Sequence, residues 1–190
     1  MVMIGVLALQ GDVREHESML QGLGVSTRQV RMSKDLDGLD GLIIPGGEST
    51  TIGRLATLYG LIDPLRDAIA AGLPTYGTCA GLILLADRLS EGTQPLLGAL
   101  DVAVRRNAFG NQNDSFEADL DVAGLHEPFH AVFIRAPWIE SFGDGVEVLA
   151  TWDGHPVMVR QGHILATAFH PELTKDERIH HLFITMTKES

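Results

Sequence analysis

The first half of the chain alternates continuous apolar runs with segments of helical periodicity. Residues 2–9 and 39–44 are almost entirely apolar, which is typical of strands buried on both faces of a parallel sheet. Residues 12–23 place apolar side chains at helical spacing, and residues 26–30 predict another short strand. This alternation predicts an α/β fold, with a doubly wound, mostly parallel sheet flanked by helices.

Capping residues predict where further helices begin. Ser49 or Thr50 can cap the helix that follows them, because a short hydroxyl side chain accepts hydrogen bonds from free helix N–H groups. Pro64 suits the first turn of the next helix. Near the end of the chain, Thr174 is expected to cap a final helix over residues 175–186.

The pattern changes beyond residue 97. Short strand patterns over residues 146–151, 155–160 and 163–169 are separated by turn dipeptides, with Asp-Gly at residues 153–154. Asp-Gly favours a primed two-residue turn, whose twist matches that of an antiparallel strand pair. An antiparallel strand meander is therefore expected in the C-terminal half.

The composition permits one sizeable domain, which we expect to span residues 1–190. The chain is 45% hydrophobic and 21% charged. A single cysteine argues against a disulfide framework, and no basic segment precedes the apolar start, so a cytoplasmic protein is expected. No apolar run approaches the roughly 20 residues that cross a bilayer, so no membrane association is expected. The net charge of −11 argues against nucleic-acid binding but permits an acidic face that docks a partner protein.

The single cysteine, Cys79, is the strongest candidate for a catalytic residue. It lies at the centre of Gly-Thr-Cys-Ala-Gly at residues 77–81, after a short apolar strand pattern and before an apolar helical run. This pattern is typical of a nucleophile elbow, in which the flanking glycines let two backbones pass closely. The N-terminus of the following helix carries partial positive charge, which favours the thiolate.

A histidine and a carboxylate near the end of the chain complete the candidate site. In Phe-His-Pro-Glu at residues 169–172, the proline disfavours helical backbone at His170. In extended backbone, side chains two residues apart project to the same side, so Glu172 can reach the imidazole and fix its tautomer. Cys79, His170 and Glu172 then provide a nucleophile, a general base and acid, and an orienting carboxylate. This combination suits acyl transfer through a thioester.

The other histidines give weaker signals. His-Glu-Pro-Phe-His at residues 126–130 satisfies a zinc-binding pattern, but that pattern requires a helix. Pro128 and the strand pattern over residues 129–134 argue against a helix, so we predict no metal site. His163 is expected to be packed or exposed without a catalytic role, and the histidines at 180–181 are expected on a solvent-facing side of a helix.

The elbow and the His-Pro-Glu segment resemble the class I glutamine amidotransferases. Further segments resemble one branch of that family, the glutaminase subunits of pyridoxal 5'-phosphate synthases, and the resemblance runs over the whole chain. The Asn-Gln-Asn-Asp stretch at residues 111–114 departs from the family, in which this stretch is often more basic, so contacts with a partner stay open. The segments that carry the resemblance are Val-Leu-Ala-Leu-Gln-Gly at 6–11, Pro-Gly-Gly-Glu-Ser-Thr at 45–50, Arg-Arg-Asn-Ala-Phe-Gly at 105–110 and Phe-Ile-Arg-Ala-Pro at 133–137.

The resemblance implies hydrolysis of L-glutamine to L-glutamate and ammonia, with Cys79, His170 and Glu172 as the catalytic residues and no cofactor. It implies that the ammonia passes to a pyridoxal 5'-phosphate synthase subunit within a hetero-oligomeric complex. It also implies a binding site for L-glutamine, formed by Gly47, Glu48, Ser49, Arg106, Ile134 and Arg135.

The chemistry of these residues agrees with that assignment. A guanidinium can hold a carboxylate in bidentate fashion, which suits Arg106 and Arg135 to the α-carboxylate of glutamine. The oxyanion of the tetrahedral intermediate needs backbone N–H donors. Ala80, directly after the nucleophile, is one candidate donor, and the turn formed by Gly46 and Gly47 is the other.

Two other interpretations stay open from the sequence. A similar elbow occurs in intracellular peptidases of the same superfamily, so a cysteine peptidase-like hydrolase is one alternative, although the two arginines and the Gly-Gly-Glu-Ser loop argue against it. A non-catalytic regulatory subunit would be marked by loss of a catalytic residue, and none is lost. We also expect the isolated chain to be nearly inactive until a synthase docks, because ammonia released without an acceptor is wasted.

Overall fold

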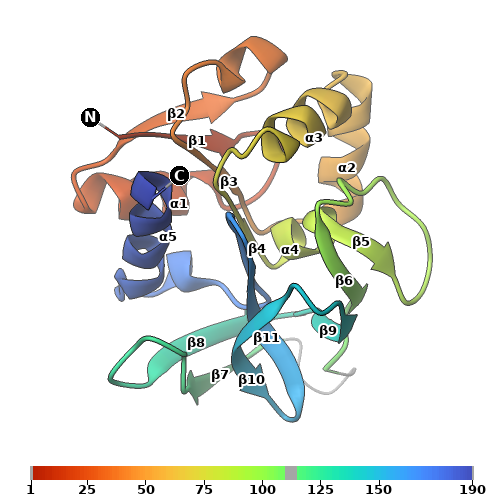
Figure 1. Ribbon diagram of the computed structural model, residues 1–190. Coiled ribbons are helices and arrows are strands. Elements are labelled where there is room, and N and C mark those ends of the chain that lie inside the picture. Colours follow the sequence, from red (N-terminus) through yellow and green to blue (C-terminus); the bar gives the residue numbers. More distant parts are fainter. Residues whose placement is uncertain (1, 110–114, 190) are drawn as a thin grey trace.

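The computed structural model describes residues 2–109 and 115–189, in which a seven-stranded sheet carries helices on both faces (Figure 1). The predicted departure from the family pattern at 111–114 lies outside the described residues. In chain order the elements are β1 Met3–Leu7, α1 Val13–Gly22, β2 Ser26–Val30, the 3-10 helix η1 Ser33–Leu36, β3 Gly41–Ile44, α2 Ser49–Leu58, α3 Ile62–Ala70, β4 Thr75–Thr78, α4 Ala80–Leu85, β5 Ala86–Leu89, β6 Leu100–Arg105, β7 Ser115–Leu120, β8 Phe129–Ile134, β9 Trp138–Phe142, β10 Glu147–Trp152, β11 His155–Gln161, β12 Ile164–Thr167, the 3-10 helix η2 Pro171–Leu173 and α5 Arg178–Glu189.

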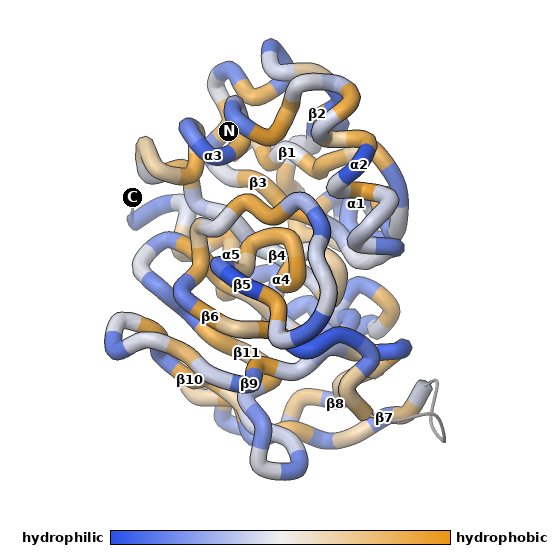
Figure 2. Tube along the Cα trace, turned by 90° about the vertical axis from the view of Figure 1, so that its right-hand side faces the viewer, coloured by the Kyte–Doolittle hydropathy of each residue, from blue (hydrophilic) through white to orange (hydrophobic). Residues whose placement is uncertain are grey.

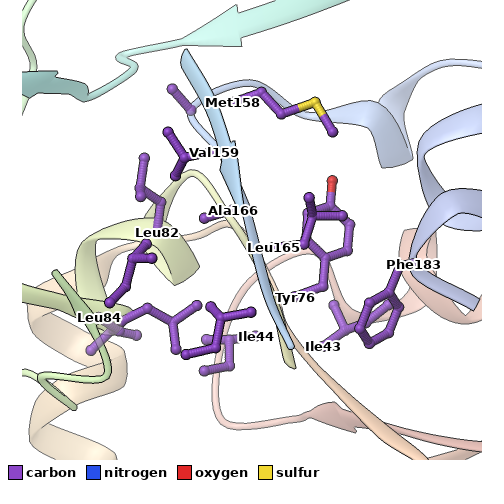
Figure 3. Close-up of a cluster of buried hydrophobic side chains, with 14 of the residues drawn as sticks. Ile43, Ile44, Tyr76, Leu82, Leu84, Met158, Val159, Leu165, Ala166 and Phe183 are labelled. Carbon is purple, nitrogen blue, oxygen red and sulfur yellow. The ribbon is translucent and has the colours of Figure 1, made fainter. Parts of the chain in front are cut away.

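The parallel part of the main sheet confirms the predicted doubly wound architecture. The strand order is β10-β11-β12-β4-β3-β1-β2, and the pairs from β12 to β2 are parallel. Neighbouring side chains of β3 point to opposite faces of the sheet: Ile44 lies toward Leu84 of α4, and Ile43 lies toward Phe183 of α5 (Figure 3). Both isoleucines are fully buried, which explains why this run shows no polar alternation.

Helices cover the two faces unequally. Figure 1 shows α1 and α5 on one face and α2, α3 and α4 on the other. All six residues of α4 are buried, and its trace is hydrophobic in the interior of the molecule, as is that of β3 (Figure 2). A helix that is apolar all round is stable only when it is buried in the fold. The burial of α4 therefore fixes the position of its N-terminus, which directly follows Cys79. None of the helices in the described ranges is long and apolar enough to span a membrane.

The predicted antiparallel meander is present as β10, β11 and β12. Asp153 and Gly154 connect the first two strands with φ values of 49° and 78°, which a primed hairpin turn requires. The last strand ends at Thr167, earlier than the predicted end at residue 169. It pairs antiparallel with β11 and parallel with β4. The meander therefore extends the parallel sheet and brings the end of β12 beside the end of β4.

Two predicted helix caps are wrong. α2 begins at Ser49, so Ser49 and Thr50 lie in its first turn and do not cap it. α5 begins at Arg178 and not at residue 175, because side chains upstream stabilise tight turns instead of a helix. Thr174 Oγ1 accepts a hydrogen bond from the Asp176 N–H at 3.1 Å, and Asp176 Oδ1 accepts one from the Arg178 N–H at 3.1 Å.

Candidate active site

Cys79 occupies the sharp turn between β4 and α4, with φ 48° and ψ −97°. The turn is possible because glycines flank it: a Cβ on Gly77 would lie 2.6 Å from the carbonyl carbon of Gly81, and a Cβ on Gly81 would overlap the carbonyl oxygen of Ile44. The Cys79 N–H donates to the Thr167 carbonyl at 2.8 Å, which anchors the turn to β12. Positive φ at a non-glycine residue costs about 1–3 kcal/mol, and such strain gathers at functional sites. The predicted elbow geometry is present.

His170 and Glu172 make the contact that the sequence predicts. His170 Nδ1 lies 2.8 Å from Glu172 Oε1, and both side chains are buried. The His170 N–H donates to the Val132 carbonyl of β8 at 2.8 Å, which fixes the backbone just after β12. With Nδ1 engaged by the carboxylate, the imidazole can use Nε2 for the nucleophile.

The surroundings of His170 favour its protonated form. Burial lowers the pKa of His170, but hydrogen bonds to its neighbours outweigh burial and raise the pKa above its ordinary value. These neighbours are Asp12, Cys79 and Glu172. Asp12 Oδ2 lies 3.4 Å from the same Nδ1 that Glu172 engages. An imidazole that is stabilised as imidazolium is a competent base for the thiol proton.

A pocket of about 290 Å³ opens beside Cys79, at the small end of the range for small-molecule sites. Of the predicted site residues, only three do not line it. Glu172 lies behind the imidazole, Ala80 opens α4, and Gly46 packs beneath His170. The predicted residues that line the pocket are Cys79, His170, Gly47, Glu48, Ser49, Arg106, Ile134 and Arg135.

The loop that precedes α2 is held tightly against His170. A Cβ on Gly46 would lie 2.5 Å from His170 Cε1, so only glycine fits there. The Gly46 carbonyl accepts a hydrogen bond from the Asp12 N–H at 3.0 Å, which fixes the orientation of the following peptide. The loop therefore carries its backbone groups to the edge of the pocket, where the N–H groups of Gly46 and Gly47 stay predicted oxyanion donors.

Backbone strain concentrates around this pocket. In the described ranges, four non-glycine residues have positive φ, and three of them line the pocket: Cys79, Asn107 (46°) and Arg135 (42°). The Ile134 carbonyl, next to one of these residues, lies 3.9 Å from Cys79 Sγ. Such strain persists only where the surrounding structure imposes it, so the fold holds the backbone of the pocket wall in a defined conformation.

Two glutamines that the sequence did not single out brace the predicted binding residues. Gln10 Oε1 accepts a hydrogen bond from the Glu48 N–H at 2.8 Å. Gln94 Oε1 accepts from Ser49 Oγ at 3.0 Å and from Arg106 Nη1 at 3.1 Å. Gln10 lies in the first segment of the resemblance and could have been found there, whereas nothing in the local pattern marks Gln94.

Replacing Gln94 by leucine is expected to raise the KM for L-glutamine roughly tenfold and to change kcat little, because the Arg106 guanidinium and the Ser49 hydroxyl lose their common acceptor. Steady-state glutaminase kinetics measure this. Gln21→Leu, on the exposed side of α1, is the matched control. A folded Gln94→Leu protein with unchanged KM would show that this brace is unimportant.

The expectation for residues 180–181 is wrong at the first of them. His181 is exposed, but His180 is fully buried, as is His16 on α1. Burial lowers the pKa of His180 to about 4 and lowers the pKa of His16 well below its ordinary value. Both imidazoles are therefore neutral at pH 7.

The buried histidines predict a loss of stability in acid. The pKa of His180 is lowered on folding from 6.5 to about 4, so the unfolded chain binds more protons below pH 6.5. The contribution of His180 to the free energy of unfolding is therefore highest above pH 6.5, and it falls by about 2 kcal/mol between that range and pH 5. Urea unfolding at pH 7 and at pH 5 measures this change. The free energy of unfolding should differ less between the two pH values for His180→Leu than for the unsubstituted chain, and His181→Gln is the control. Equal pH dependence in all three proteins would contradict the prediction.

The structure confirms that the segment with the zinc-like pattern is not helical and shows how His130 and His163 are engaged. Residues 126–127 form a bend and residues 129–130 already lie in β8, so the zinc-like pattern is not helical. His130 instead lies 2.8 Å from Asp119 Oδ1 and 2.8 Å from Glu117 Oε2 on the neighbouring strand. His163 is packed, with Nε2 2.8 Å from the Ile69 carbonyl.

Comparison with known proteins places the chain in a family. The profile of the SNO glutamine amidotransferase family matches residues 6–189. A protein of Frankia alni named pyridoxal 5'-phosphate synthase subunit PdxT is 59% identical over 190 residues, which cover 98% of this chain and 96% of that protein. A protein of the same name from Mycobacteroides abscessus is 57% identical over 189 residues, covering 98% and 97%.

Solved structures agree. The crystal structure of a glutamine amidotransferase matches with a TM-score of 0.94 and 53% identity over 97% of this chain and 98% of that chain. A glutamine amidotransferase from Thermotoga maritima, at 12% identity and a TM-score of 0.64 over 99% and 85% of the two chains, shares the fold. The chain belongs to the SNO glutamine amidotransferase family.

Proposed function

We propose that this chain hydrolyses L-glutamine through a thioester on Cys79 and delivers the ammonia to a pyridoxal 5'-phosphate synthase subunit. The observation that carries the proposal is the arrangement of Cys79 on a strained elbow, beside a buried His170–Glu172 pair, in a pocket that also holds Arg106 and Arg135. The names of the PdxT relatives support the pathway.

The reaction proceeds in two halves. Cys79 Sγ attacks the side-chain amide carbon of glutamine while His170 accepts the thiol proton. Collapse of the tetrahedral intermediate breaks the C–N bond, and His170 returns the proton to the leaving ammonia. A water molecule, deprotonated by His170, then attacks the thioester and releases glutamate and the free thiol. In both halves the oxyanion accepts hydrogen bonds from the N–H of Ala80 and from the turn at Gly46 and Gly47.

The pocket suits a small zwitterion. Arg106 and Arg135 offer guanidinium groups for the α-carboxylate, and Glu48 offers an acceptor for the α-ammonium group. A volume of about 290 Å³ suits a single free amino acid better than an extended peptide. The size and the paired arginines therefore favour glutamine over the peptide substrate of a cysteine peptidase-like hydrolase.

Partner docking completes the proposal. Glutamine hydrolysis is useful only where ammonia is consumed, so the chain acts within a hetero-oligomeric complex and is nearly inactive alone. The Gly46–Gly47 peptide is the element that docking would adjust, because its N–H is a proposed oxyanion donor at the pocket edge. Reorienting it would require the hydrogen bond from the Asp12 N–H to the Gly46 carbonyl to break.

Transfer of labelled nitrogen tests this function. The complex of this chain with a pyridoxal 5'-phosphate synthase subunit is supplied with amide-¹⁵N glutamine, the synthase's other substrates and excess unlabelled ammonium. We expect ¹⁵N in the product despite the competing ammonium, and little glutamate release by the isolated chain. Product nitrogen at the isotopic ratio of the bulk ammonium would contradict delivery, and high activity of the isolated chain would contradict activation by the partner.

A further inference from the structure

A buried chain of hydrogen-bonding groups lies behind the candidate catalytic residues. His16 Nε2 lies 3.1 Å from Thr78 Oγ1 and 3.6 Å from Glu172 Oε1. On its other side, His16 Nδ1 lies 3.0 Å from His180 Nε2. Both imidazoles are fully buried, and neither lines the glutamine pocket. These contacts thus connect α5, through α1, to the Glu172 carboxylate that engages His170. Both helices lie on the same face of the sheet (Figure 1).

The geometry selects one tautomer for each imidazole. His180 Nδ1 is buried and has no hydrogen-bond partner in the described part of the chain, so a proton there would be an unsatisfied donor. The proton therefore lies on His180 Nε2, which donates to His16 Nδ1. His16 then carries its proton on Nε2, where it donates to Thr78 Oγ1 and faces the Glu172 carboxylate. The opposite arrangement would aim the lone pair of His16 at a carboxylate.

We propose that His16, oriented by His180, is a positioning residue that keeps Glu172 ionised and aimed at His170. The inference rests on the proposed roles of His170 and Glu172. Neither His16 nor His180 lines the substrate pocket, so any effect of either residue on catalysis is indirect.

Glu172 needs such support because its environment disfavours its charge. Burial raises the pKa of Glu172, and the nearby Asp12 carboxylate raises it further. The hydrogen bond to His170 opposes these effects. His16 adds a second N–H near the same oxygen, and the nearby Tyr76 hydroxyl is engaged with Thr167 Oγ1 at 3.1 Å. Four further charged side chains line a second pocket together with Glu172: Arg14, Glu15, Lys175 and Glu177. Burial keeps both His16 and His180 neutral. The N–H dipole of His16 therefore faces the Glu172 carboxylate without adding a buried positive charge to that of His170.

Substitution of His16 tests the proposal in the complex with the synthase subunit. His16→Leu should lower kcat for glutamine hydrolysis roughly ten- to a hundredfold with KM unchanged, and should move the acid limb of the pH profile to higher pH. His16→Gln, whose amide nitrogen stands as far from the backbone as Nε2, should restore most of kcat and return the acid limb. His163→Gln removes another packed histidine far from Glu172 and is the matched control. A folded His16→Leu protein with unchanged kcat and pH profile would overturn the proposal.

Histidine tautomers provide a readout that does not depend on activity. Long-range ¹H–¹⁵N spectra of the imidazoles in the full-length chain, assigned with the His16→Gln and His180→Leu variants, should show both residues neutral and protonated on Nε2. Protonation of either residue on Nδ1 would overturn the proposal. Glu172→Gln separates this inference from its foundation: full activity of that variant would overturn the proposed catalytic residues, whereas an inactive Glu172→Gln beside an unimpaired His16→Leu would overturn the positioning role only.

Discussion

Replacing Cys79 by alanine is expected to lower kcat/KM for glutamine hydrolysis by roughly 10⁴-fold or more. The chain contains no other cysteine, and the strained elbow presents this side chain to the pocket beside His170. Without the thiol no thioester can form, and the remaining groups can only polarise the amide. Glutamate release by the complex with the synthase subunit, supplied with L-glutamine, measures the effect.

Binding of L-glutamine to the substituted protein is the control for this substitution. Cys79→Ala leaves Arg106, Arg135 and the loop at Glu48 in place, so L-glutamine should still bind to the complex, as calorimetry would show. Retention of more than a tenth of the hydrolytic rate would rule out Cys79 as the nucleophile. Loss of binding together with loss of rate would indicate that the elbow had collapsed, and the rate would then not identify the nucleophile.

Replacing Gly81 by alanine is expected to destabilise the protein by about 3 kcal/mol or more, the largest effect on folding that we predict. An added Cβ would overlap the carbonyl oxygen of Ile44 in β3, and backbone cannot move aside as a flexible side chain can. α4 would have to shift away from the sheet and would carry Cys79 with it.

Urea unfolding of Gly81→Ala beside Gly145→Ala measures this loss. A Cβ on Gly145 would meet only Gln161 Nε2 at 3.5 Å, an ordinary contact, so this control should change stability little. Similar free energies of unfolding for the two variants would contradict the close packing of α4 against β3.

The sequence predicted those parts of the fold that depend on local pattern. β8 has the predicted bounds because its alternating apolar residues determine burial directly. β2 also has the predicted bounds, although most of its residues are polar. The start of α5 was misplaced because Thr174 and Asp176 form side-chain turns that compete with a helix. The burial of His180 was predictable in principle, since it lies three and four residues before the buried Phe183 and Ile184 on one helical stripe.

In the candidate site, too, only the features that depend on local sequence could be predicted. The contact between His170 and Glu172 followed from two residues and a proline, and the elbow followed from five consecutive residues. The braces around them could not be predicted, because their partners lie far away in the sequence. Ser49 and Gln94 are 45 residues apart, and His16 and His180 are 164 residues apart. Only the folded sheet brings such pairs into contact.

The most direct test of the central claim is detection of the covalent intermediate. The complex with the synthase subunit is quenched with acid during turnover of L-glutamine, and the peptide that contains Cys79 is analysed by mass spectrometry, with Cys79→Ala as the blank. The account predicts a γ-glutamyl thioester on Cys79 that disappears once glutamine is exhausted. Steady hydrolysis of glutamine with no adduct on this peptide at any quench time would contradict it.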